Sequence, residues 1–390
     1  MQPSRYPHLA FQRRWSLSEK AAFELGQCDA IVTAISNTPI LPEYHARLLH
    51  ISLTKGAQAT TAIEGNTLTD EEIERVAAGK SLPPSKEYQE REVRNILEAF
   101  NTLLLEAVRD GKSEPISEQL LRRFHYMIGH DLGEHFDAIP GELRRDHRIV
   151  GPYRPPGPED VPVLIDQLSE WLLREFHFDR GQTFAQAVIQ AIITHVYIEW
   201  IHPFADGNGR TGRLVEFYIL LRAGTPDIAS HILSNFYNET RTEYYRQIDK
   251  ANKSRDLSGF IEYAIQGLRD GLLKTLTLIQ QNQFEITWRQ LIYDRFAAKP
   301  YVKKSVFIRQ RELALALPME GSSSLEQIGL INPRIAQEYG RLSERTLARD
   351  LAELELLNIV VKDGDRYRSN ARSLTGQTAR RQRRETGSVD

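Results

Sequence analysis

Apolar residues recur along most of the chain with the three-to-four-residue spacing of amphipathic helices. Helices are predicted at about residues 16–35, 43–63, 85–109, 117–128, 161–176, 183–200, 213–221, 232–252 and 257–296. The segment 183–200 is apolar on nearly all faces, as expected for a helix at the centre of a core. The pattern therefore predicts a mainly α-helical protein.

Two helix ends are marked by their residues. Thr69 is followed three positions later by Glu72, which is the pattern of a capping box and predicts the start of a short helix. Gly65 is a natural C-terminal cap for the helix 43–63. Glu64 then lies at a helix C-terminus, where the dipole disfavours a carboxylate by roughly a few tenths of a kcal/mol. A carboxylate in this position suggests a cationic partner elsewhere in the chain.

Two segments depart from the helical pattern. Residues 136–156 contain GELRRDHRIVG, rich in turn residues and β-formers, followed by several prolines, and they predict a β-hairpin. Residues 322–370 read as helix, helix, turn and helix, and then as a two-stranded ribbon. Ser343 caps the third of these helices, and Asp363-Gly364 forms the tight turn of the ribbon. This order predicts a C-terminal winged-helix domain.

A chain of 390 residues is expected to form two or three domains of roughly 150 residues each. The expected divisions are an N-terminal helical region, a central core, a winged helix and a basic tail, at residues 1–84, 85–298, 299–372 and 373–390. The tail is polar and rich in arginine. Because it has too few apolar residues to fold, it is expected to be disordered.

Composition narrows the classes of function. The formal net charge of -2 and the pI near 6.6 give no global electrostatic reason for binding nucleic acid or an anionic membrane. Cys28 is the only cysteine, which excludes an intrachain disulfide and a thiolate zinc cluster and fits a reducing compartment. The first residues lack an apolar signal core, and no later stretch approaches about 18 uninterrupted apolar residues. We therefore expect a soluble, cytoplasmic protein that does not enter membranes.

The most informative stretch is residues 202–213, which read HPFADGNGRTGR directly before an apolar helical run. If Asn208 opens that helix, the N–H groups around Gly207, Asn208 and Gly209 point out of a helix N-terminus into a glycine-lined concavity, which is an anion site. The glycines allow a phosphate to approach the backbone closely. This part of the motif predicts phosphate binding.

Four charged or titratable residues complete the motif. Arg210 and Arg213 are three positions apart, so they can bracket successive phosphates. Asp206 is placed to hold a hard cation such as Mg²⁺, and His202 to accept a proton from an attacking hydroxyl. Taken singly, a His-Pro pair is usually a turn and two arginines are usually solvated. Their combination at this spacing favours phosphate chemistry.

The stretch resembles the signature of the Fic proteins, H-P-F-x-[DE]-G-N-G-R-x-x-R, and matches it at every specified position from His202 to Arg213. The resemblance extends from about Thr60 to Ile261. It implies a Fic-type helical core with a β-hairpin flap. It also implies transfer of AMP, from ATP and with Mg²⁺, to a Tyr, Thr or Ser hydroxyl of a target protein.

The resemblance assigns a role to each residue of the motif. His202 would deprotonate the target hydroxyl and Asp206 would hold the metal. Asn208, with the amides of Gly207 and Gly209, would bind the α- and β-phosphates, and the pair Arg210 and Arg213 would steady the β- and γ-phosphates. In the related Doc proteins the glycine after the acidic position is replaced and a kinase-like reaction results. The intact Gly207-Asn208-Gly209 therefore favours nucleotidyl transfer.

A subset of the family carries [ST]-x-x-x-E-[GN] on a helix before the core, and residues 60–65, TTAIEG, match this pattern. In that subset the glutamate pairs with the second arginine of the signature and spoils the γ-phosphate site. The corresponding residues are Glu64 and Arg213. A carboxylate on Arg213 would remove a charge-assisted clamp and repel the incoming phosphate. Taken alone, the pattern at residues 60–65 is loose, and an exposed glutamate at a helix end would explain it. Because the same chain also carries the Fic signature, the resemblance implies autoinhibition.

Two weaker matches concern substrate binding. Residues 136–156 resemble the family's flap, whose exposed edge aligns the target by strand pairing; Arg148, Ile149 and Val150 would form its docking part, with Arg148 at an often apolar position. Tyr244, Tyr245 and Asn252 resemble a stretch that closes the adenine pocket. Adjacent helical residues cannot face the same way, so one tyrosine is as easily explained by core packing.

Histidines 125, 130 and 135 do not indicate a metal site. A spacing of five residues turns each by about 140° from the last on a helix, so the three do not share a face.

Other functions remain open at this point. The winged helix suggests a DNA-binding regulator, but its third helix mixes Arg345 and Arg349 with four acidic residues, Glu344, Asp350, Glu353 and Glu355. The same module serves equally well for protein interaction or for a homodimer. Some family members remove AMP from modified proteins instead, with the counterpart of Glu64 orienting the water. The expected partners of the enzyme are an unidentified target protein and the chain itself, through self-modification.

Overall fold

The computed structural model describes residues 5–109, 114–177, 183–299 and 303–374. The chain divides into two compact units, residues 1–279 and 280–390. Each unit has its own hydrophobic core, so each is described by itself. The fold is mainly helical, with one small antiparallel sheet, as the sequence predicts.

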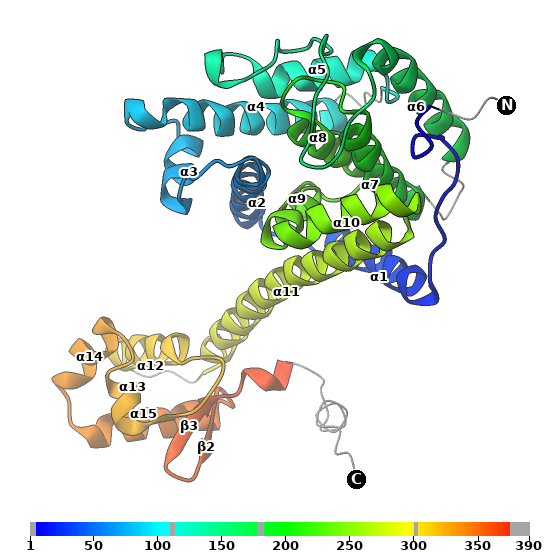
Figure 1. The fold of residues 1–390 in the computed structure, drawn as a ribbon. Coiled ribbons are helices and arrows are strands. Elements are labelled where there is room, and N and C mark those ends of the chain that lie inside the picture. Colours follow the sequence, from blue (N-terminus) through cyan, green and yellow to red (C-terminus); the bar gives the residue numbers. More distant parts are fainter. Residues whose placement is uncertain (1–4, 110–113, 178–182, 300–302, 375–390) are drawn as a thin grey trace. The chain divides into compact units, whose positions relative to one another are not determined.

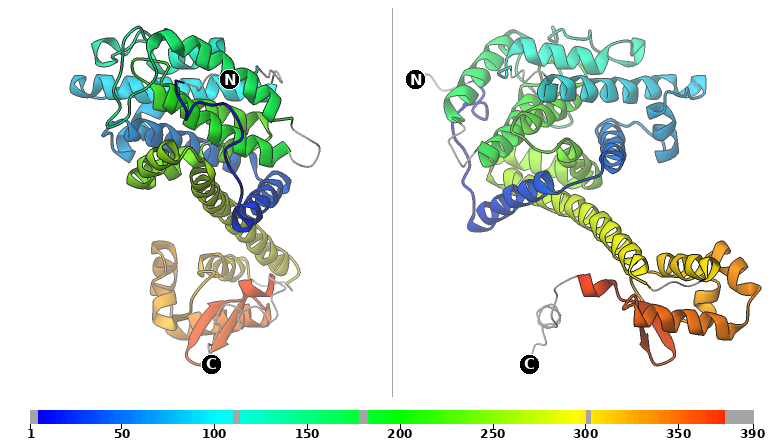
Figure 2. Two further views of the ribbon diagram at one scale, coloured as in Figure 1. Left: turned by 45° about the vertical axis from the view of Figure 1, so that its right-hand side comes forward. Right: turned by 180° about the vertical axis from the view of Figure 1, so that it is seen from behind.

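The first unit is built from helices alone apart from short 3-10 turns, within its described residues. Its α-helices are α1 (Glu19–Asn37), α2 (Pro42–Ile63), α3 (Asp70–Ala77), α4 (Glu87–Arg109), α5 (Glu118–Gly129), α6 (Val161–Glu175), α7 (Thr183–Ile201), α8 (Asn208–Arg222), α9 (Ile232–Glu239), α10 (Arg241–Ser254) and the first part of α11 (Ser258–Ala297). The pair α7 and α8 lies at the centre, with α2, α4 and α5 against α8 (Figures 1 and 2). Every residue of α8 from Asn208 to Leu221 is buried.

Helix α7 has the composition expected of a central helix. Among the described residues it is the one helix long and apolar enough, by length and composition, to cross a membrane, and 72% of its apolar window is buried inside this unit. Its apolar residues, such as Ile192 and Val196, are fully enclosed by the neighbouring helices. Burial in the protein core therefore accounts for its apolarity.

The helix signals read from the sequence are confirmed at the start of α3 and the end of α2. Thr69 and Glu72 form the capping box in both directions. Glu64 is the C-terminal cap of α2, and Gly65 follows with φ +104°. In contrast, the helix predicted at 232–252 is divided into α9 and α10 at Thr240. The Thr240 hydroxyl donates to the carbonyl of Phe236, a local bond that competes with helix continuation.

The prediction of a β-hairpin at residues 136–156 is wrong, because the segment does not form a regular ladder of hydrogen bonds between two strands. The segment is a loop with a single bridge, in which Val150 and Tyr153 exchange two backbone hydrogen bonds of 2.9 Å. Three prolines, at 152, 155 and 156, lack the N–H that a ladder needs. The Arg144 guanidinium also donates to the carbonyls of Asp146 and Pro156, so these acceptors are taken by a side chain.

The second unit contains α12 (Lys304–Ala316), β1 (Ser323–Ser324), α13 (Leu325–Gly329), α14 (Pro333–Gly340), α15 (Glu344–Leu356), β2 (Val360–Asp363) and β3 (Arg366–Ser369). The strands form an antiparallel sheet in the order β1-β3-β2, with Ser323 opposite Tyr367 and Val360 opposite Ser369. The turn after Asp363 contains Gly364 with φ +62°, so the predicted ribbon is confirmed. The order of elements is the one predicted; the assignment as a winged helix stays a prediction.

The division between the two compact units falls within α11, between residues 279 and 280. The boundary predicted from the sequence lies between residues 298 and 299. The later part of α11 belongs to the second unit because Trp288, Ile292 and Phe296 pack in its core with residues such as Leu351. The predicted disordered tail, residues 373–390, lies outside the described residues from 375 onwards.

Candidate active site

The loop between α7 and α8 carries the motif, and two residues give it its shape. His202 has φ +51° and Gly207 has φ +79°. A Cβ at Gly207 would lie 2.9 Å from Ile128 Cδ1 and 3.0 Å from the Phe136 ring, so only glycine fits there. Helix α8 then begins at Asn208, which is earlier than the predicted range 213–221 and is the start that the anion-site hypothesis assumed.

The side chain of Asn208 closes this loop. Its Oδ1 accepts from the N–H of Phe204 at 2.9 Å, and its Nδ2 donates to the carbonyl of Phe204 at 2.8 Å. The side chain proposed for phosphate binding is thus used by the loop itself. The N-terminus of α8 is left as the anion-binding part, because the N–H of Gly207 donates to Asp206 Oδ1.

His125 supports the motif loop from α5. Its ring stacks on Phe204 with centroids 3.8 Å apart, its Nδ1 accepts from the N–H of Gly141 at 2.9 Å, and its Nε2 meets the carbonyl of Asp206 at 2.9 Å. The histidine therefore holds the motif loop and the 136–156 segment together. Sequence reasoning considered it only as a metal ligand, because nothing in its spacing indicates Phe204.

His202 is placed as an uncharged base. Its Nδ1 is buried and has no hydrogen-bond partner in the part of the chain that the structure describes. Burial, aided by the nearby Arg144 guanidinium, lowers the pKa of His202 to about 4. The imidazole is therefore neutral near pH 7 and can accept a proton.

Asp206 keeps part of its carboxylate available. Its Oδ1 accepts from the N–H of Gly207 and, at 2.9 Å, from Arg210 Nη2, while the side chain stays 33% exposed. Within the described residues there is no group of three or more His, Cys, Asp or Glu side chains that could hold a metal. One carboxylate is still sufficient for Mg²⁺ when a nucleotide supplies phosphate oxygens, so the donor set fits that ion.

Arg210 is held by two carboxylates. Only 3% of its side chain is exposed; Nη1 pairs with Glu92 from α4 and Nη2 with Asp206, and the guanidinium lies over the Phe136 ring at 5.3 Å. Burial raises the pKa of Glu92 against the opposing effect of Arg210. Sequence reasoning missed Glu92, because a single glutamate on an amphipathic helix has no distinguishing pattern.

Arg213 joins the start of α8 to the end of α2. Its Nε donates to Thr60 Oγ1 at 2.7 Å, and its Nη2 donates to the Thr60 carbonyl at 3.0 Å and to Glu64 Oε1 at 2.6 Å. The Arg213 side chain is 1% exposed and that of Glu64 is 29% exposed. Burial acts to raise the pKa of Glu64, but Arg213 and Arg210 prevail and hold it below its ordinary value. The structure therefore brings together the two residues that the sequence paired.

Gly209 lies at the meeting point of these groups. A Cβ there would collide with Glu64 Oε1, and it would lie 2.9 Å from Arg213 Nη1 and 3.1 Å from Glu199 Oε1. Glu64 thus reaches the predicted anion loop itself. Glu199, three residues before His202, is a second carboxylate that sequence reasoning missed; burial raises its pKa.

Replacing Thr60 with valine should destabilise the first unit. Thr60 is 2% exposed, and the change removes its hydroxyl from Arg213 Nε while keeping the size of the side chain. Leaving this buried donor without a partner is expected to lower the free energy of unfolding by about 1–3 kcal/mol. Thr277→Val, on an exposed part of α11, is the control and should change it by less than about 0.5 kcal/mol. Equal values for the two variants in urea denaturation would contradict this role of Thr60.

The three residues assigned to the adenine pocket differ in how exposed their side chains are. Tyr244 is 1% exposed, and its hydroxyl lies 3.1 Å from His195 Nε2, so it packs in the core. Tyr245 is 48% exposed, and its hydroxyl donates to the carbonyl of Ile63 at 3.3 Å, beside the end of α2. Asn252 has a buried Nδ2 with no hydrogen-bond partner among the described residues. Tyr245 is the member of the pair that remains available to a ligand.

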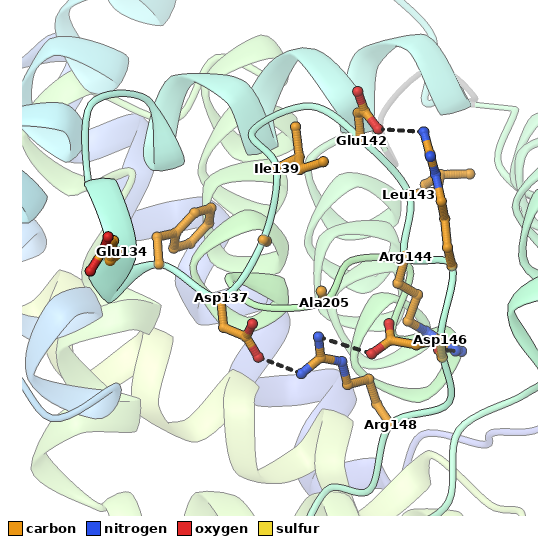
Figure 3. Close-up of a pocket in the computed structure, with 12 residues that line it drawn as sticks. Glu134, Asp137, Ile139, Glu142, Leu143, Arg144, Asp146, Arg148 and Ala205 are labelled. Carbon is orange, nitrogen blue, oxygen red and sulfur yellow. Dashed lines mark hydrogen bonds and ion pairs between the residues drawn. The ribbon is translucent and has the colours of Figure 1, made fainter.

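The predicted docking residues lie on the loop at 136–156. Arg148 pairs with Asp137 at 2.6 Å and with Asp146 at 3.1 Å (Figure 3). Ile149 and Val150 are 68% and 39% exposed. These two apolar side chains face solvent. The β-strand expected at this position is absent from the described loop, which has a single β-bridge instead.

Comparison with known proteins agrees with this geometry. A family model described as the Fic/DOC family matches residues 115–220. The chain is 30% identical over 208 residues to a protein named Protein adenylyltransferase Fic from Nematostella vectensis, covering 52% of this chain and 44% of that protein. It is 30% identical over 221 residues to a protein of the same name from Drosophila willistoni, covering 56% and 40%. The chain thus spans less than half the length of these relatives.

Two solved structures share the fold. One, a Fic family protein from Desulfovibrio desulfuricans G20, has a TM-score of 0.56 at 22% identity and covers 94% of this chain and 99% of that chain. The other, a Fic domain containing signaling protein from Bacteroides thetaiotaomicron, has a TM-score of 0.52 at 21% identity and covers 66% and 95%. These solved structures show the fold alone, and the Fic/DOC family model shows that residues 115–220 of this chain match a Fic domain.

Proposed function

We propose that this protein transfers AMP from ATP to a hydroxyl group of a protein. The observation that carries the proposal is the placement of a neutral, partly buried histidine on the loop that leads into α8, with Arg210 and Arg213 in the first turns of that helix. Relatives that match about half of this chain are named protein adenylyltransferases, which supports the same reaction. The target is a Tyr, Thr or Ser side chain of a second protein or of the chain itself.

His202 takes the proton of the target hydroxyl in this reaction. The hydroxyl oxygen then attacks the α-phosphorus, the bond from that phosphorus to the bridging oxygen breaks, and pyrophosphate leaves. The amides of residues 208 and 209, at the N-terminus of α8, stabilise the negative charge on the phosphates. Arg210 and Arg213 supply the charged donors farther along the triphosphate.

Asp206 is the residue that would hold Mg²⁺, because its carboxylate is partly exposed next to the anion loop. The ion would neutralise charge on the phosphate oxygens. Arg210 positions the Asp206 carboxylate through its bond to Oδ1, so the two side chains act as one unit.

Glu64 is proposed to hold this activity back. Arg213 Nη2 is bonded to Glu64, and the same guanidinium is needed by the terminal phosphate of ATP. Because two anions cannot occupy one set of donors, the nucleotide has to displace Glu64. Inhibition is then a competition for Arg213.

Labelled ATP tests the reaction directly. With the Glu64→Gly variant, label at the α-phosphate should become attached to protein, and label at the γ-phosphate should not. Attachment of the γ-label would indicate a kinase-like reaction and overturn the proposal. The absence of both labels, with wild-type and variant protein in a cell lysate as the source of targets, would overturn it as well.

The pH dependence reports on His202. Protonation removes the base, so the rate should fall only as the pH drops toward the lowered pKa of about 4. For Glu64→Gly we expect kcat/KM to be level from about pH 5.5 to 8 and to have its acid limb near 4. An acid limb near 6.5, the ordinary value for histidine, would contradict the buried, neutral state. Protein returned from acid to pH 7 serves as the control for irreversible unfolding.

A further inference from the structure

A pocket of about 320 Å³ lies beside the loop that carries His202. Its walls come from residues 134–148, and Ala205 of the motif loop closes one side (Figure 3). Arg144 connects the pocket to the base: its backbone N–H donates to the carbonyl of Pro203 at 3.0 Å, and its Nε to the carbonyl of His202 at 2.6 Å. The pocket is therefore built onto the same short loop as the base.

Arg148, a cationic side chain of the protein itself, forms part of the wall of this pocket. The Arg148 guanidinium lies between two carboxylates, with Nη1 2.6 Å from Asp137 and Nη2 3.1 Å from Asp146 (Figure 3). Arg148 is 26% exposed, whereas Asp137 and Asp146 are 77% and 58% exposed. Both carboxylates can thus be reached from solvent while they hold the arginine.

The backbone that carries the two carboxylates is held in place by its neighbours. Arg144 is 4% exposed and donates from Nη1 to the carbonyl of Asp146 at 2.7 Å, which anchors that residue. Asp137 follows Phe136, a buried side chain packed against Arg210. Arg148 itself has a buried Nε with no hydrogen-bond partner among the described residues, so only its terminal nitrogens are bound. Because both carboxylates are exposed, a cation from another molecule can compete with Arg148 for them.

We propose that Asp137 and Asp146 bind an arginine or lysine of the target protein, and that Arg148 holds this place until the target arrives. The inference rests on the proposed function and specifies its substrate class: a hydroxyl residue with a basic residue nearby in the same segment. The pair of carboxylates matches the forked donors of a guanidinium. Ile149 and Val150 provide exposed apolar contacts directly after Arg148.

Peptide binding tests the pocket without any turnover. The probes are fluorescent twelve-residue peptides with one central tyrosine, in which arginine, alanine or glutamate is placed at each flanking position in turn. With Glu64→Gly protein, the best arginine peptide should bind roughly five- to tenfold more tightly than its alanine counterpart, as one charge-assisted pair allows. Asp137→Asn with Asp146→Asn should remove this difference, and Arg148→Ala should increase it.

Arg174→Ala is the matched control. Arg174 is exposed on α6 and does not line the pocket, so its loss should leave the preference for arginine unchanged. Equal binding of the arginine, alanine and glutamate peptides at every position would overturn the inference. So would a preference for arginine that survives in the Asp137→Asn, Asp146→Asn protein.

AMP transfer to the same peptides separates this inference from the proposed function. If α-labelled ATP modifies the peptides or the protein itself without any preference for arginine, the proposed function stands and the pocket assignment is wrong. If arginine peptides bind through Asp137 and Asp146 but no AMP is ever transferred, the pocket stands as a peptide site and the proposed reaction is wrong.

Discussion

Replacing His202 with alanine in the Glu64→Gly background should lower the rate of AMP transfer by about 10²–10⁴-fold. The change removes the group proposed as the proton acceptor, while Arg210, Arg213 and the N-terminus of α8 stay in place to bind the nucleotide. The loss should therefore be in kcat, with a smaller effect on KM for ATP. The measurement is the initial rate of α-label incorporation at several ATP concentrations.

His177→Ala is the matched control, because this histidine is exposed and lies outside the site. It should transfer AMP at the rate of the Glu64→Gly parent. Thermal unfolding of both variants shows whether the loss of a buried imidazole has destabilised the fold. A folded His202→Ala variant that keeps its activity within about threefold of the parent would exclude His202 as the base.

Replacing Glu64 with glycine should raise AMP transfer by about 10–100-fold at low ATP concentration. The estimate follows from the charge-assisted hydrogen bond between Glu64 and Arg213 Nη2, since such a bond is worth roughly 1.5–3 kcal/mol and each 1.4 kcal/mol is a factor of ten. If inhibition is competition for Arg213, the gain should appear mainly as a lower KM for ATP. The measurement is the ATP dependence of label incorporation in wild type and variant.

Glu64→Gln distinguishes charge from shape at this position. It keeps the length of the side chain but removes the negative charge that Arg213 binds, so most of the gain should remain. Glu71→Gln, on the exposed face of α3, is the control and should behave as wild type. Wild-type ATP dependence in both Glu64 variants would mean that the contact with Arg213 does not limit nucleotide binding.

Chemistry that depends on near neighbours was predictable from the sequence. The helices, the capping box at Thr69 and the start of α8 at Asn208 follow from residues a few positions apart, because helical contacts and caps are local. The motif 202–213 likewise carries its base, its acid and its two arginines within twelve residues. The pairing of Glu64 with Arg213 came from resemblance to a family, since nothing local connects two residues so far apart.

The groups that position the site were decided by the tertiary structure alone. Thr60, Glu92 and His125 reach the motif from α2, α4 and α5, and a single polar residue on an amphipathic helix leaves no periodic signal of its distant partner. The segment 136–156 shows the same limit. Its residues favour a hairpin, but the Arg144 guanidinium binds backbone carbonyls of this segment that a ladder would need. The same guanidinium also binds the carbonyl of His202 and so connects the segment to the motif loop.

The sequence by itself therefore determined the helical class of this protein and predicted phosphate binding by its motif, because both depend on residues close together in the chain. The tertiary structure decided which side chains surround His202, occupy Arg213 and line the pocket beside Ala205. Those outcomes depend on burial and on contacts between distant helices, and only the folded chain brings these groups within a few ångströms of one another.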